Sequence, residues 1–160
     1  MSELFTSNVN QEANDIIDIN IQASKRKRIR INQDDSKILE LDTTDLSIVS
    51  RFQQKYQEMI KLIETCFSNM PVSEDGDDIE DIGTSLANVD AQMRKVIDEI
   101  FNSNVSEICA PTGSMLDPIN GKFRFEHIFE ALFALYETDI NSELNKLNSR
   151  VQKHTSKYIK

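Results

Sequence analysis

Turn-forming residues are scarce in this sequence of 160 residues, which contains only 4 glycines and 3 prolines. Sandwiches and barrels need many tight turns between short strands, so this scarcity argues against a many-stranded fold and favours helices. Cysteine is also rare. Cys66 and Cys109 are far apart and lack the CxxC spacing of zinc or redox motifs, so we expect buried thiols in a reducing compartment rather than a disulfide framework.

Long apolar runs are missing, and no stretch of roughly 18 apolar residues could form a membrane helix. The N-terminal segment MSELFTSNVNQEAND has neither the basic start nor the apolar core of a signal peptide. We therefore expect a cytoplasmic protein without membrane contact, in the host cell cytoplasm if the chain is viral. The net charge of -9 and the pI near 4.7 argue against nucleic acid as a partner, because binding to phosphate needs a positive surface.

Motifs for catalysis or cofactor binding are absent as well. The sequence has no GxSxG, GxxxxGK[ST] or GxGxxG motif, and neither His127 nor His154 has a metal-ligand neighbour at usable spacing. His127 follows Glu126 and lies near Glu130, but a histidine beside carboxylates is more often structural than an acid–base catalyst. We predict no enzyme activity, no cofactor and no bound metal.

The N-terminal part combines an arm with a predicted β-hairpin. Residues 1–24 lack a long periodic apolar face, and five basic residues follow between positions 25 and 30. From Arg28 to Ile31 basic and apolar residues alternate, which favours a strand with a solvated basic face over a patch that docks nucleic acid or a partner. Turn formers and a second alternation from Leu39 to Leu41 complete the hairpin, at residues 27–41. Helices or another subunit must cover the apolar face of so small a sheet.

Apolar residues at alternating spacings of three and four predict three principal amphipathic helices, near residues 44–68, 84–102 and 123–157. With the hairpin they define a mainly α fold and a single helical domain over residues 25–160. Residues 102–122 contain glycine and proline and are predicted to form a loop that apolar side chains, Ile119 among them, pin to the core. The predicted common core comprises Val49, Phe52, Tyr56, Leu86, Val89, Met93, Phe129, Leu132 and Tyr136.

Six carboxylates occupy eight positions between Glu74 and Asp81. They do not fit a calcium-binding EF-hand loop, because in the frame that starts at Asp75 the fifth position is Ile79 and the sixth is Glu80. Self-repulsion of these charges favours a solvated linker over residues 70–83. The other interpretation is a phosphate mimic directed against a host nucleic-acid-binding protein.

The last predicted helix is too long for the compact core. About 35 residues span about 50 Å at 1.5 Å per residue, whereas a domain of this size has a radius of gyration near about 15 Å. The apolar stripe continues onto the end that should project, and cations flank it; they suit the negative end of the helix dipole or an acidic docking surface. The residues predicted to bind a client or a second copy of the chain are Leu144, Leu147, Arg150, Val151, Lys153, Lys157 and Tyr158.

The order of these parts resembles a known family of viral proteins. The predicted strand pair and long helix correspond to the segment RIRINQDDSKILELDTTDLSIVSRF. The second helix, after the charged linker, corresponds to ANVDAQMRKVIDEIF. The turn and the final helix correspond to PINGKFRFEHIFEALFALYETDINSELNKL, followed by KHTSKYIK. Over residues 28–160 the pattern is similar to that of tail-assembly chaperones encoded in the tail-gene region of bacteriophages of low-GC bacteria. The resemblance implies a cytosolic protein that holds the tape-measure protein and recruits tail-tube subunits before the tube is built.

Three classes of function remain open, and all three act by binding proteins. The leading hypothesis is an assembly chaperone or scaffold whose amphipathic helices cover apolar segments of a client. The second is a structural or connector protein of the virion. The third is an anti-defence inhibitor that uses the carboxylates of residues 74–81.

Overall fold

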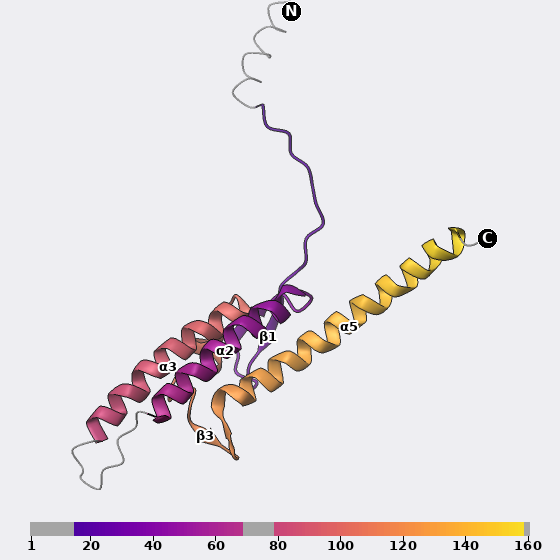
Figure 1. The fold of residues 1–160 in the computed structure, drawn as a ribbon. Helices are drawn as coiled ribbons and strands as arrows, with labels where there is room; N and C mark the ends of the chain where they lie inside the picture. Colours follow the sequence, from indigo (N-terminus) through magenta and orange to yellow (C-terminus); the bar gives the residue numbers. More distant parts are fainter. Residues whose placement is uncertain (1–14, 69–78, 159–160) are drawn as a thin grey trace, which may run out of the picture.

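The computed structural model describes residues 15–68 and 79–158, except for the side chains of Ile79 and of residues 154–158. Within these residues it contains four helices and two antiparallel strand pairs. Two helices lie side by side, and a much longer one, α5, crosses beside them and extends beyond them (Figure 1). The fold is mainly helical with a small hairpin near its N-terminal end, which confirms the predicted fold class.

The hairpin occupies the predicted residues. Strand β1 (Lys27–Arg30) pairs antiparallel with β2 (Ile38–Leu41), with Ile29 opposite Leu39. Leu39 is fully buried and Ile29 is half-buried against the core, whereas the arginines on either side of Ile29 face solvent. Arg28 and Arg30 therefore form the solvated face of the strand, as the alternation predicted, whereas Lys27 lies on the same face as Ile29 and pairs with Asp139 of α5.

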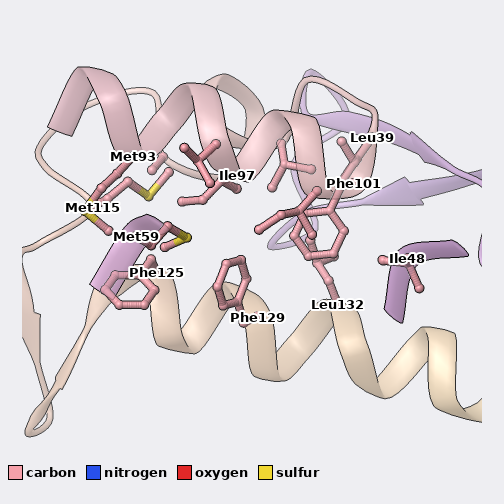
Figure 2. Packing of buried hydrophobic residues seen from close by; sticks show 14 of the residues in the cluster. Leu39, Ile48, Met59, Met93, Ile97, Phe101, Met115, Phe125, Phe129 and Leu132 are labelled. Carbon is pink, nitrogen blue, oxygen red and sulfur yellow. The ribbon is translucent and has the colours of Figure 1, made fainter. Parts of the chain in front are cut away.

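Helices α2 (Ser47–Ser68) and α3 (Ile79–Phe101) pack against each other in antiparallel directions (Figure 1). Helix α2 begins three residues later than predicted, because the Asp45 carboxylate accepts a hydrogen bond from the Ser47 backbone N–H at 3.0 Å and so caps the helix there. Buried methionines, Met59 of α2 and Met93 of α3, lie between the two helices (Figure 2).

Helix α3 begins five residues earlier than predicted, so residues 79–83 belong to a helix and the predicted linker is too long. Glu80 and Asp81 lie in the first turn of α3, where the helix dipole favours negative charge. This dipole interaction explains why acidic residues could begin a helix that apolar periodicity alone placed later. Residues 70–78 of the predicted linker lie outside the described residues.

The segment between α3 and α5 is more regular than the predicted loop. It contains α4 (Val105–Cys109) and a short pair of strands, β3 (Pro118–Ile119) and β4 (Lys122–Phe123). Arg94 of α3 holds the segment, since its guanidinium donates to the backbone carbonyls of Ser106, Ala110 and Gly113. The prediction that Ile119 pins the segment to the core is wrong, because Ile119 lies beside the β3–β4 turn and is exposed.

Helix α5 (Arg124–Tyr158) is held to the other helices by aromatic side chains. The ring centroids of Phe52 and Phe133 are 4.8 Å apart, and those of Phe101 and Phe129 are 5.8 Å apart. In Figure 2 Phe125 and Phe129 point from α5 toward the methionines of the core. Bulky rings thus fill the space between α5 and the α2–α3 pair.

Most of the predicted core residues are buried or pack against the buried cluster; Met93, Phe129, Leu132 and Tyr136 are in the core itself. Val49 is the exception, with 54% of its surface exposed. The buried face of α2 is set by Ile48, Met59 and Cys66, and Val49 lies at the edge of this face. The prediction was wrong there because periodicity does not distinguish the centre of an apolar face from its edge.

Candidate partner-binding surfaces

The C-terminal half of α5 carries an apolar row that the rest of the described structure does not bury. Every described side chain from residue 141 to residue 153 is exposed. The exposed fractions are 39% for Leu144, 50% for Leu147 and 59% for Val151. These three residues, spaced by three and four, lie on one face of the helix, and we call them the projecting stripe. Figure 1 shows that this half of α5 extends away from α2 and α3.

The projecting stripe continues a groove that begins on the core. Between α2 and α5 lies an open hollow of about 280 Å³, here called the α2–α5 groove. Ile140, one turn before Leu144, lines its end, and the exposed Val49 lines the α2 side. The remaining lining residues are Ile48, Phe52, Phe133, Tyr136 and Glu137. An apolar surface therefore runs without interruption from the core to the projecting half of α5.

The other predicted binding residues are placed only in part. Arg150 and Lys153 are exposed on the projecting half of α5. The backbones of Lys157 and Tyr158 belong to the last turn of α5, but their side chains lie outside the described residues. The structure thus brings Leu144, Leu147, Arg150, Val151 and Lys153 onto one helical segment.

A polar cluster fixes the point at which α5 leaves the domain. The Asp139 carboxylate lies 2.6 Å from the Lys27 ammonium of β1 and accepts a hydrogen bond from the hydroxyl of Thr43, which is buried. The bonds from Lys27 and Thr43 hold the pKa of the Asp139 carboxyl below its ordinary value of 3.8. Asp139 therefore links α5 to both the hairpin and the turn before α2.

A second apolar surface lies on a different face of α5, next to the hairpin. It is an open hollow of about 420 Å³, here called the hairpin groove. Ile29 and Ile31 line it from the hairpin, and Ile128 and Leu135 line it from α5. Arg30, Asn32, Cys109, Arg124, His127, Ala131 and Leu132 complete the lining. Burial raises the pKa of the Cys109 thiol to about 11, so this thiol is protonated at neutral pH.

The arm that precedes β1 is a further apolar segment. Residues 15–26 form neither helix nor strand, and Ile17, Ile19 and Ile21 expose 86%, 73% and 78% of their surface. The described part of the predicted arm, residues 15–24, therefore lies outside the helical core, and residues 1–14 fall outside the description. Sequence reasoning did not identify the arm or the hairpin groove as binding surfaces. The signal for the arm was the alternation of Ile17, Ile19 and Ile21 with polar residues, which is short and follows a further isoleucine, Ile16.

His127 forms no acid–base pair with Glu126 or Glu130 in the structure, because all three side chains have other partners. His127 Nε2 lies 2.7 Å from the carbonyl oxygen of Ile119. Glu126 accepts a hydrogen bond from the Phe123 backbone N–H at 2.8 Å, as expected for a carboxylate that caps a helix start, and Glu130 pairs with Lys122. Both carboxylates are thus engaged in structural contacts. Among the described residues no three histidine, cysteine or acidic side chains are grouped so that they could hold a metal ion.

In the portion of the chain that the structure describes, no helix combines the length and the apolar character needed to cross a membrane. Comparison with protein-family models, with curated proteins and with solved structures gives no match for this chain.

Proposed function

We propose that this chain is a non-enzymatic protein-binding factor that holds an apolar segment of a client against the α2–α5 groove and the projecting stripe. The observation that carries the proposal is the apolar row that leaves the core at Ile140 and continues, exposed, through Leu144 and Leu147. An amphipathic client helix lying in such a groove would cover this row.

The charges of the chain suit a factor of this kind. Arg150 and Lys153 flank the stripe on a protein whose net charge is -9. Local cations direct a client with acidic flanks to the stripe, while the negative charge of the whole molecule keeps a complex with an aggregation-prone client dispersed. The structural contacts of Glu126 and Glu130 support the non-enzymatic part of the proposal.

The choice of client rests on the resemblance to tail-assembly chaperones over residues 28–160. On that basis we propose that the client is the tape-measure protein or the tail-tube protein of a bacteriophage, and that the complex forms in the cytoplasm of the host cell. The apolar row supports a binding role, and the resemblance alone supports this choice of client.

The test is co-expression of the chain with the tape-measure protein, and separately with the tail-tube protein, from the same genome. The wild-type chain should keep its client in the soluble fraction and co-purify with it. The double variant L144D/L147D places two charges in the stripe, and we expect it to lose the client, because burying an unpaired carboxylate strongly opposes binding.

The matched control is S142D/N145D, which adds the same two charges at the same spacing on the opposite face of α5, where both positions are exposed. It should bind the client as the wild type does. Equal binding by L144D/L147D would contradict the docking surface. If the wild-type chain changes neither the solubility nor the purification of either viral protein, the proposed clients are wrong.

A further inference from the structure

The arm before β1 has the properties of a strand that lacks a partner. Ile17, Ile19 and Ile21 alternate with polar residues, which is the period of a strand with one apolar face. The arm runs away from the helices as an extended chain (Figure 1), and its isoleucines are exposed. A segment of this kind is stabilised when it pairs with the edge of a sheet.

β1 supplies such an edge. Within the described residues its sheet consists of β1 and β2 alone, so one side of β1 has no neighbouring strand. Unpaired N–H and C=O groups on an edge of this kind are a template for another strand. The hairpin groove, lined by Ile29 and Ile31, lies beside the same strand and can receive apolar side chains from a strand added there.

The arm does not reach this edge within its own chain. It continues directly into β1, and the two residues at the junction are held: the Ser24 hydroxyl donates to Asp42 Oδ2 at 2.7 Å, and the Arg26 guanidinium donates to the Asn102 carbonyl at 3.0 Å. Of the residues that favour tight turns, residues 22–26, QASKR, contain only Ser24, and its hydroxyl is bonded to Asp42. The occupant of the groove must therefore come from another molecule.

We propose that residues 17–31 of two copies of this chain pair antiparallel about a two-fold axis at Ser24. The arm of each copy then extends β1 of the other and places its isoleucines in the hairpin groove of that copy. Ile17 lies opposite Ile31 of the second copy, and Ile19 lies opposite its Ile29. The two hairpins join into one sheet with the order β2–β1–β1–β2.

The residues on the two faces of this ribbon favour that register. On the groove face Ile17 meets Ile31 and Ile19 meets Ile29, while nearer the axis Ile21 meets Lys27; on the outer face Asp18 lies opposite Arg30, and Asn20 lies opposite Arg28. Opposite charges at directly paired positions stabilise antiparallel strands, whereas like charges destabilise them. Arg30 already pairs with Asp35 at 2.8 Å, and its guanidinium has donors for both carboxylates.

Neighbouring registers are less favourable. A shift of one residue turns the isoleucines to solvent. A shift of the axis to residue 25 is unfavourable because it sets Lys25 opposite Lys25 of the second copy, and like charges repel. A shift to residue 23 is unfavourable because it sets the charged Asp15 opposite the apolar Ile31. The self-association does not rest on the proposed client, because the hairpin groove and the α2–α5 groove use different residues of α5.

The first experiment measures the oligomeric state by sedimentation equilibrium. The wild-type chain should be a dimer, and I17D/I19D should raise the dimer dissociation constant by about 100-fold or more, because four apolar side chains per dimer lose their burial. The control N20D/Q22D adds the same charges at the same spacing on the outer face, opposite arginines, and should dimerise at least as well as the wild type. All four substitutions lie in the exposed arm, so the folded domain should keep its circular dichroism spectrum.

A wild-type chain that is monomeric at about 100 μM would overturn the proposal. So would an I17D/I19D variant that dimerises like the wild type, or an N20D/Q22D variant that is weakened as much as I17D/I19D.

The second experiment tests the register by cross-linking. Directly opposite Cα atoms in an antiparallel pair are about 4.5 to 5.5 Å apart, within reach of a disulfide. S24C should therefore form a disulfide-linked dimer under mild oxidation, and N20C should form one only when mixed with R28C. The wild-type chain, whose Cys66 is buried and whose Cys109 is half-buried, is the control. Equal cross-linking of N20C alone and S24C, or no cross-linking of S24C, would overturn the register.

Discussion

Asp139 is the residue on which the base of the projecting helix depends. Because its folded-state pKa lies below the ordinary value of 3.8, its contribution to stability is complete above pH 3.8 and is lost as the pH falls through the folded value. D139N removes the charge but leaves an oxygen that can accept from Thr43. We expect D139N to lower the free energy of unfolding at pH 7 by about 0.5 to 1 kcal/mol, because it loses the ion pair with Lys27, a partner that solvent screens.

Urea denaturation of the wild type and D139N at pH 7 and near pH 2 checks this prediction. The difference between the two proteins should shrink at the lower pH, because the charged fraction of the wild-type carboxyl falls as the pH approaches its folded-state pKa. A difference that stays the same at both pH values would show that the charge of Asp139 does not stabilise the fold.

Leu132 and Val49 test the core residue by residue. Leu132 is 3% exposed, and L132A should cost about 2 to 5 kcal/mol of unfolding free energy through lost burial and a residual cavity. Val49 was predicted to belong to the same core, but it is 54% exposed, so V49A should cost less than about 0.5 kcal/mol. Thermal or chemical denaturation measures both; similar costs for the two variants would contradict the burial seen in the structure.

At the scale of the elements, α5 separates into a buried half and an exposed half. Among its described side chains, the buried ones run from Phe125 to Tyr136 and all precede residue 141. Truncation after Asn145 should therefore change the free energy of unfolding by less than about 1 kcal/mol while it weakens client binding. Urea denaturation and co-purification with the client measure the two effects. Unfolding of the truncated protein would place the C-terminal half in the core; full client binding would remove the stripe from the proposal.

Sequence periodicity was sufficient for elements with one wide apolar face. It predicted the hairpin at residues 27–41, and it placed the last helix within one residue of the observed Arg124–Tyr158. Periodicity failed for elements whose position is set by electrostatics or by contacts between distant parts of the sequence. The first turn of α3 forms on acidic residues that only the helix dipole favours, and α4 depends on Arg94, which is distant in sequence from the carbonyls that it holds.

The candidate binding surfaces also differ in how far the sequence predicts them: a surface on one helix is predictable, whereas a surface between distant segments is not. The projecting stripe was predictable, because its residues share one helix and the helix is longer than the core. The hairpin groove was not, because it joins β1 to the first half of α5, about 100 residues later in the chain, and no local pattern reports that proximity. The α2–α5 groove could not be predicted either, because it depends on the packing of Phe52 of α2 against Phe133 of α5.

On the scale of the whole molecule, the two grooves use different faces of α5, so the proposed self-association and the proposed client binding would not compete for the same side chains. Two copies joined through their arms would present two projecting helices. Such a dimer can hold one long client at two points, and the second contact forms at a high effective concentration once the first is made.

Helix α5 contains no glycine or proline from Arg124 to Tyr158, so nothing in its sequence provides a hinge between the buried half and the exposed half. In mechanical terms it is a lever. About 30 Å of helix extends past Tyr136, the last buried side chain among those described, and a load on the tip exerts a torque about the place where α5 meets the domain. Asp139, with its bonds to Lys27 and Thr43, lies at that fulcrum, so a pull on the proposed client would be transmitted through Asp139 to the strand that carries the arm.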